Sequence, residues 1–146
     1  MTTPSKKGRA ITLRESCPCG GDPVGAEYAE CCGRWIDHFA TAPAPDAAAL
    51  MRSRYTAFVR EDAAYLLATW HHSTRPTTLD FDAGIKWLGL EVRAERGVDD
   101  THAEVEFVAR SRLQGRAIRL HERSRFVREN GENGLLRWFY VDGSFS

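Results

Sequence analysis

The chain has 146 residues, 42% of them apolar, and 20 basic against 20 acidic side chains, so its formal net charge is zero. This length allows one ordinary domain with a small appendage, and the balanced charge argues against a dedicated nucleic-acid-binding protein. No apolar run approaches the ~20 residues that span a bilayer, and no apolar segment follows the basic N-terminus as in a secretory signal. We therefore expect a cytoplasmic protein with no membrane association.

Composition divides the chain into four segments. Residues 1–16 are polar and basic and are predicted to be a disordered tail. Residues 17–36 contain all four cysteines, residues 37–45 form a short linker rich in Pro and Ala, and residues 46–146 form the main domain.

The cysteines lie as two pairs, Cys17 with Cys19 and Cys31 with Cys32. Four soft thiolates can close a tetrahedral shell around Zn²⁺, which leaves no position open for a substrate. A disulfide between the adjacent Cys31 and Cys32 would be strained, and the C-x-x-C redox motif is absent. The spacing therefore predicts a structural zinc ion held by all four cysteines.

Two helices are predicted at the start of the main domain. Residues 47–60 carry apolar side chains at helical spacing, with Asp46 in the position of the N-cap. Asp62 is placed as the N-cap of a second helix, which is predicted over residues 63–70.

The pattern then changes towards strands. A third, short helix is predicted to begin at Asp80 or Asp82 and to reach Trp87, before Gly89. After it, apolar and polar residues alternate between turn signals, which predicts antiparallel strands near 90–94, 103–110, 116–128 and 136–141. Helices followed by hairpins indicate an α+β fold, a curved antiparallel sheet with the N-terminal helices on one face.

Two sets of motifs resemble known proteins. The stretch CPCGG…EYAECCGRWI is similar to the SEC-C motif, a zinc knuckle also found at the C-terminus of the SecA translocation ATPase. The segments LMRSRYTAFVREDAAYLLATWH, LGLEV, VEFVAR, LHERSRFVRE and RWFYVDG resemble the YchJ family of small bacterial proteins. The resemblance covers residues 17–143 and implies a SEC-C-like knuckle followed by a cone-shaped domain like nuclear transport factor two. It also implies an uncharacterised function.

The knuckle departs from the usual motif in one respect. Eleven residues separate Cys19 from Cys31, where the motif has eight, so we interpret three residues around Asp22–Val24 as an insertion. A longer loop costs little in closure entropy, so we expect the ligands to be kept. We expect the insertion to alter a partner surface formed by that loop.

A second group of candidate residues lies in the main domain. Helical spacing puts Arg54 inside an apolar face, and strand parity puts Glu122 and Ser124 on the apolar face of their strand. An unpaired buried charge is costly, so we predict an Arg54–Glu122 ion pair, with Ser124 or Tyr55 adding hydrogen bonds. The pair is either a structural link between helix and sheet or, together with Trp70, the polar base of a ligand pocket.

The histidines are weaker candidates. His121 has the strand parity of Arg123 and Arg125, which predicts an exposed side chain. His71 or His72 is predicted to lie at a helix end, where an imidazolium is favoured by the helix dipole, with general-base duty as the alternative.

Residues 110–128 carry seven Arg and one Glu. These arginines are either solvated side chains on alternate strand positions or a surface for an anionic partner.

Two functions remain open. The first is a zinc-binding adaptor or binding protein whose knuckle contacts a protein partner and whose cone carries a small ligand. The second is an enzyme of the isomerase, dehydratase or hydrolase type that uses a pocket lined by Glu and Arg. We favour binding, because the sequence does not put two acid–base groups on one face, and we assign no catalytic residue.

Overall fold

A computed structural model describes residues 10–146; the first nine residues of the predicted tail lie outside the described part. The elements in chain order are the 3-10 turn η1 (Tyr28–Glu30), the helices α1 (Gly33–Ile36), α2 (Ala47–Arg60) and α3 (Ala63–Ala68), and the strands β1 (Lys86–Asp99), β2 (His102–Leu113), β3 (Arg116–Asn130) and β4 (Leu136–Phe145).

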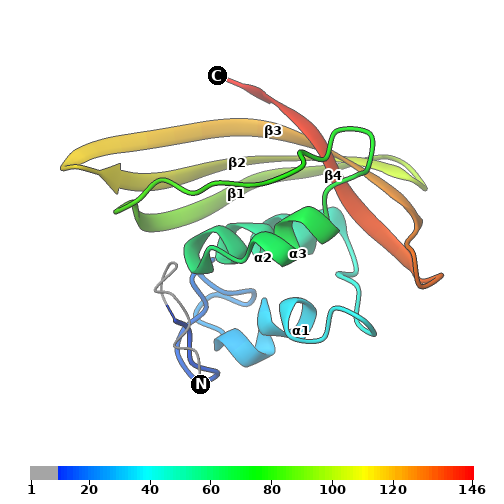
Figure 1. Cartoon of the computed structure of the whole chain (residues 1–146), viewed down its shortest axis with the longest axis horizontal. Coiled ribbons are helices and arrows are strands. Elements are labelled where there is room, and N and C mark those ends of the chain that lie inside the picture. The colour runs from blue at the N-terminus through cyan, green and yellow to red at the C-terminus, as the bar shows by residue number, and fades with distance from the viewer. Residues whose placement is uncertain (1–9) are drawn as a thin grey trace.

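These elements form three layers (Figure 1). The top layer is a curved antiparallel sheet in the order β1-β2-β3-β4, in which each strand pairs with the next one along the chain. Helices α2 and α3 lie beneath the sheet, and the N-terminal segment with α1 lies beneath α2. The predicted α+β class is confirmed.

Helix α2 spans the residues that the sequence predicted. The carboxylate of Asp46 accepts a hydrogen bond from the Ala49 amide at 2.7 Å, as an N-cap does. The helix ends at Arg60. Its C-cap, Glu61, has a φ of 56° in the left-handed region, and the Glu61 amide donates to carbonyl groups of the last turn. Local capping therefore defines both ends of this helix.

Helix α3 begins after the predicted cap Asp62 but ends at Ala68, two residues earlier than expected. The backbone of Trp70 instead forms a parallel bridge with Tyr140 of β4. Bonding to the sheet therefore competes with the last helical turn and ends the helix.

The prediction of a third helix up to Trp87 is wrong. The chain turns at Gly84, whose φ is 78°, and β1 begins at Lys86. Trp87 pairs with Ser111 of β2, and its ring packs edge-on against Tyr55 of α2. The apolar side chains of this segment thus reach the core from an edge strand.

One continuous core extends from the sheet to the cysteines. Alternate residues of β2, including Val105 and Phe107, are buried against Leu50 of α2, and Cys19 and Cys32 belong to the same cluster of contacts. The segments predicted as tail and linker also contact this unit. The backbone carbonyl of Glu15 accepts a hydrogen bond from the Tyr28 amide. The ring of Phe39 packs edge-on against Tyr65.

Candidate functional site

The four cysteine side chains converge in the N-terminal segment beneath α2. Cys17 and Cys19 lie before η1, and Cys31 and Cys32 lie between η1 and α1. Each is at most 4% exposed, and the four sulfur atoms lie within 4.8 Å of one another. The fold therefore brings together, as free thiols, the four residues that the sequence singled out.

A zinc ion fits this arrangement. Tetrahedral Zn–S bonds of about 2.3 Å put neighbouring sulfur atoms about 3.8 Å apart, and the sulfur atoms of Cys19 and Cys31 are 3.5 Å apart. A shell of four thiolates has no position for water or substrate, so the donor set suits a structural ion.

The protonation of the thiols also favours a cation. Hydrogen bonding from Cys19 lowers the pKa of Cys17 far below its ordinary value, and the same contact raises the pKa of Cys19. A divalent cation stabilises the thiolate form of every ligand, so binding releases protons.

Two glycines allow the chain to fold this tightly. A Cβ at Gly21 would overlap the backbone around Ala26, and a Cβ at Gly33 would overlap Tyr28. The amide of Gly21 also donates to the sulfur of Cys19 at 3.3 Å. Such a hydrogen bond orients a metal ligand from outside the coordination shell.

Thr56 of α2 joins the cluster to the main domain, a contact that sequence reasoning missed. Its hydroxyl donates to Cys32 Sγ at 3.3 Å and lies 3.7 Å from Cys17 Sγ. Arg60, four residues further along the same helix face, donates to the Tyr28 hydroxyl. In the sequence, this contact was indicated by two polar residues four positions apart on a helix that is otherwise mostly apolar. Such a pair suggests that a second face of the helix packs against another segment.

A cavity of about 280 Å³ lies between α2 and the inner face of the sheet. Its walls are mostly apolar, and all five predicted pocket residues line it. The other residues that line it are Met51, Phe58, Trp87, Phe107, Ala109, Leu120, Phe126, Tyr140 and Phe145.

The predicted direct ion pair between Arg54 and Glu122 is not formed in this cavity. The Arg54 guanidinium donates to the Leu66 carbonyl at 2.8 Å and to the Thr69 hydroxyl at 2.7 Å, and it lies 4.6 Å from the ring centroid of Tyr140. Burial lowers the pKa of Arg54 to about 10, which leaves it charged at neutral pH. The guanidinium thus contacts a backbone carbonyl, a hydroxyl and an aromatic ring, and makes no direct hydrogen bond to the Glu122 carboxylate.

Glu122 has two hydroxyl partners instead of Arg54. Its Oε2 accepts from Ser124 Oγ at 2.6 Å and from the Tyr140 hydroxyl at 3.1 Å. Burial first, and then the Glu122 carboxylate, raise the pKa of Tyr140, so the phenol is a neutral donor. Tyr140 therefore lies between the two buried charges, and strand parity alone did not reveal this residue.

The remaining pocket residues have different surroundings. The ring of Tyr55 packs against Trp87 at 5.5 Å between centroids. The indole nitrogen of Trp70 is buried and has no hydrogen-bond partner among the described residues. An unsatisfied buried donor at a cavity wall is a position where a bound ligand could supply an acceptor.

The structure corrects both histidine predictions. The His121 side chain is only 23% exposed, and its Nε2 lies 2.6 Å from Glu106 of the neighbouring strand, a partner that strand parity does not reveal. His71 and His72 follow the end of α3 rather than cap it, since the His71 amide donates to the Tyr140 carbonyl.

The arginine-rich hairpin is partly neutralised by acids on neighbouring strands. Arg110 lies 3.5 Å from Glu91, and Arg125 forms a two-pronged ion pair with Asp142. The predicted surplus of positive charge is therefore smaller on the folded surface than in the sequence.

Two features define the class of this protein: four buried cysteines beneath α2, and a curved sheet that encloses a cavity against the other side of α2. It is an α+β protein with a SEC-C-type knuckle. Residues 46–143 match the family description "YchJ, middle NTF2-like domain". The chain belongs to the YchJ family.

Relatives and solved structures support this assignment. A UPF0225 protein of Polaromonas sp. is 63% identical over 140 residues, covering 92% of this chain and 96% of the relative. A UPF0225 protein of Bordetella parapertussis is 54% identical, covering 88% of this chain and 91% of the relative.

Two solved structures are similar along most of the chain. A SEC-C motif-containing protein from Psychrobacter arcticus has a TM-score of 0.76 at 29% identity, covering 92% of this chain and 84% of the other. A SEC-C motif-containing protein from Rhodopseudomonas palustris has a TM-score of 0.70 at 31% identity, covering 88% and 97%.

Within residues 10–146, none of the helices has the length and apolar character needed to cross a membrane.

Proposed function

We propose that this chain is a zinc-stabilised binding protein that carries a small, mostly apolar ligand in its cone and contacts a protein partner through its knuckle. The observation that carries the proposal is the cavity of about 280 Å³. Its volume lies just below the range of about 300–1,000 Å³ for small-molecule pockets, which suits a small ligand.

The polar groups of the cavity indicate the chemistry of the ligand. The indole nitrogen of Trp70 requires an acceptor, and the Glu122 carboxylate can accept a further hydrogen bond from a donor. Apolar walls surround both groups. A small aromatic or aliphatic alcohol matches this combination of apolar surface, donor and acceptor.

Phenol is a suitable probe for this cavity. We expect saturation-transfer NMR to detect phenol binding to the full chain and to lose the signal in Ala109→Phe, which fills the cavity. Leu120→Phe is a second filling variant, and Ala117→Phe, at an exposed position of β3, is the matched control. Equal phenol binding by filling and control variants, or none by the wild type, would contradict the ligand proposal.

The knuckle supplies the surface proposed for a protein partner. Val24, in the loop interpreted as an insertion, is 94% exposed, and Leu13 beside the knuckle is 59% exposed. Because the zinc shell is closed, the ion would hold this surface rigid rather than react.

Capture from cell extract tests this contact. We expect Val24→Asp to keep the zinc ion of the four cysteines and to lose the captured partner, whereas Cys31→Ser loses both that ion and the partner. Recovery of the same partners by all three proteins would remove the knuckle from the functional account.

An enzyme remains the second candidate, because Tyr140 and Glu122 form a hydrogen-bonded acid–base pair inside the cavity. In this proposal the carboxylate moves a proton of the bound molecule, and Arg54 stabilises the resulting negative charge. Glu122→Gln distinguishes the two functions. The variant should still bind the ligand in either case. Conversion of the ligand by the wild type, lost in the variant, would indicate an enzyme, whereas a carrier shows no conversion in either protein.

A weaker surface proposal concerns the arginines of residues 110–128. Several of them have acidic partners, yet Arg112, Arg116 and Arg119 are exposed, so an anionic partner could bind there. Such binding would weaken steeply with added salt.

A further inference from the structure

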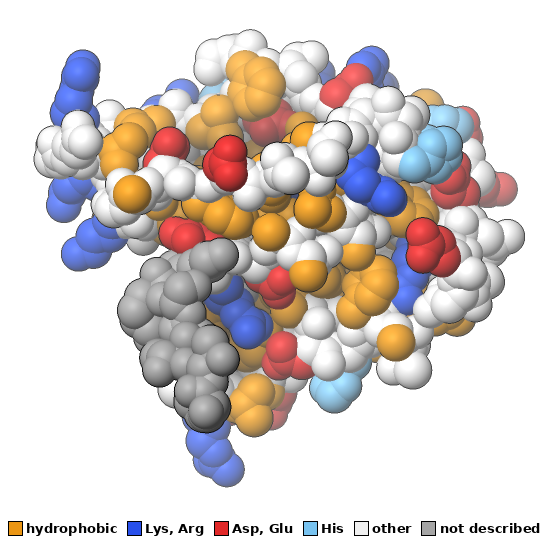
Figure 2. Space-filling model, viewed as in Figure 1, with side chains coloured by type: hydrophobic (Ala, Val, Ile, Leu, Met, Phe, Trp, Pro, Cys, Tyr) orange, Lys and Arg blue, Asp and Glu red, His pale blue; other side chains and the backbone are white. Residues whose placement is uncertain are grey.

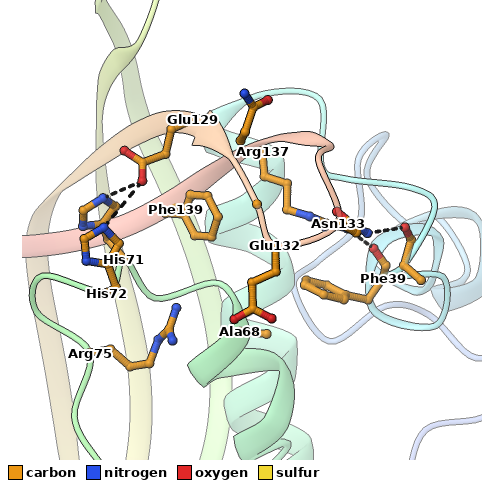
Figure 3. Close-up of a pocket in the computed structure, with 13 residues that line it drawn as sticks. Phe39, Ala68, His71, His72, Arg75, Glu129, Glu132, Asn133, Arg137 and Phe139 are labelled. Atoms are coloured by element: carbon orange, nitrogen blue, oxygen red, sulfur yellow. Dashed lines mark hydrogen bonds and ion pairs between the residues drawn. The ribbon is translucent and has the colours of Figure 1, made fainter.

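Three side chains outside the cysteine cluster meet at one end of a second cavity, of about 380 Å³. The Nε2 atom of His71 lies 3.0 Å from Glu129 Oε1, and Nε2 of His72 lies 3.8 Å from the same oxygen. Figure 3 shows both imidazoles directed at this carboxylate. At the upper right of Figure 2, histidine and acidic side chains lie side by side on the surface.

The backbone holds the two histidines in this position. The bridge between Trp70 and Tyr140 and the hydrogen bond from the His71 amide to the Tyr140 carbonyl, 2.8 Å long, fix the chain against β4. The two imidazole rings stack with centroids 4.2 Å apart and planes tilted by 31°. Both Nε2 atoms therefore point to the end of β3, where Glu129 lies.

The three ligand atoms have the spacing of a metal site. All lie within 4.8 Å of one another. Bonds of about 2.0–2.1 Å to a tetrahedral zinc ion put neighbouring ligand atoms roughly 3.4 Å apart, and the distances of 3.0 and 3.8 Å from the carboxylate oxygen fall on either side of that value.

The surroundings of His71 complete the site. Its Nδ1 lies 2.7 Å from Ser73 Oγ and accepts a hydrogen bond from the Ser73 amide at 3.2 Å. A metal on Nε2 would move the ring proton to Nδ1, where the Ser73 hydroxyl can accept it. This outer contact is the usual support of a metal-ligating histidine. Two imidazoles and one carboxylate are ligands that Zn²⁺ accepts, and three protein ligands leave at least one position open.

We propose that His71, His72 and Glu129 form a second metal site for Zn²⁺ or a similar divalent transition-metal ion, separate from the four-cysteine site. The three residues line the cavity of about 380 Å³ together with Arg75 and Glu132, which Figure 3 also labels. The inference is independent of the ligand proposed for the cone.

Equilibrium dialysis of the full chain against buffered micromolar free Zn²⁺ tests the site. We expect two equivalents of zinc per wild-type chain and one for His72→Ala or Glu129→Gln. The His72 side chain is 74% exposed, so its removal should leave the fold intact. Loss of an outer hydrogen bond to a ligand typically weakens metal binding about 10–100-fold, and loss of a ligand should weaken it at least as much.

The matched control is His102→Ala, which removes a histidine that pairs with one acid, Asp99, in the β1–β2 hairpin. This control should keep both equivalents. One equivalent bound by the wild type, or a second that survives in both His72→Ala and Glu129→Gln, would overturn the proposal and leave a simple ion pair. Titrating the chain with Cu²⁺ gives a second readout, since the nitrogen splitting in its EPR spectrum should change from that of two imidazole ligands to that of one in His72→Ala.

Discussion

The guanidinium of Arg54 lies 4.6 Å from the ring centroid of Tyr140, whose hydroxyl donates to the Glu122 carboxylate at 3.1 Å. One aromatic side chain thus contacts both buried charges, the cation through its face and the anion through its hydroxyl. This arrangement replaces the direct ion pair expected from the sequence, and it makes Tyr140 the central residue of the cavity.

Tyr140→Phe should destabilise the fold. It keeps the ring beneath Arg54 but removes one of the two hydroxyl donors to Glu122, and leaving a buried group less satisfied typically costs about 1–3 kcal/mol. Chemical denaturation should measure this loss. Glu122→Gln in the same background completes a double-mutant cycle, in which a coupling energy below ~0.5 kcal/mol would argue against the contact.

Gly143→Ala should also disturb the cavity. A Cβ at Gly143, which pairs with Ser124 in the sheet, would overlap the Glu122 carboxylate. Overpacking of this kind costs about 1–3 kcal/mol. Gly97→Ala is the matched control, since Gly97 also lies in a strand but has open space at its Cβ position. Equal stability losses in the two variants would contradict the close packing at Glu122.

Removal of the zinc ion proposed for the four cysteines should loosen α2 as well as the knuckle. The cysteines and α2 share one core, and Thr56 bonds directly to Cys32. Cys32→Ser should therefore lose one equivalent of zinc and, if about 3 kcal/mol of stability is lost with it, lower the Tm by on the order of 10 °C. An unchanged Tm would mean that the knuckle does not support the main domain.

Thr56→Val tests the contact between α2 and the cluster without removing a ligand. The variant keeps the shape of the side chain but loses the hydroxyl that donates to Cys32. We expect it to retain zinc at saturation but to lose it about 10–100-fold more readily in a chelator competition. Ser53→Ala removes another buried hydroxyl of α2, one that is hydrogen-bonded to Tyr65 of α3, and should leave zinc affinity unchanged.

The ion pair of Arg125 and Asp142 should make a small, pH-dependent contribution. Hydrogen bonding to Arg125 lowers the pKa of Asp142, so its stabilisation is present above the unfolded-state pKa of about 3.9 and is lost as the pH falls through the folded-state value. Because the pair is largely exposed, we expect Asp142→Asn to cost at most about 1 kcal/mol at pH 7. This corresponds to roughly 2–4 °C in Tm.

Thermal unfolding as a function of pH checks this expectation. The Tm difference between wild type and Asp142→Asn should disappear in strong acid, while Asp100→Asn at the β1–β2 turn serves as the control. A difference that grows as the pH falls would have the wrong sign for this mechanism.

Structural features that depend on neighbouring residues could be predicted from the sequence. The Asp46 cap, the extent of α2 and the alternation of Val105 and Phe107 depend on residues a few positions apart, and the structure has them as predicted. The helix predicted up to Trp87 failed for the opposite reason. The prediction relied on Asp80 or Asp82 as the start of a helix, but the pairing of Trp87 with Ser111 in β2 decided the conformation.

The sequence by itself determined the α+β class, the exclusive set of four cysteines and the apolar faces that carry Arg54 and Glu122. Only the tertiary structure decided which side chains meet: Tyr140 between those two charges, Thr56 on Cys32, and His71 with Glu129, which is 58 residues away. The physical reason is that caps and periodicity come from neighbouring residues. Contacts between distant segments depend instead on strand register and on where each helix ends, and a shift of one residue in a strand turns every side chain to the other face.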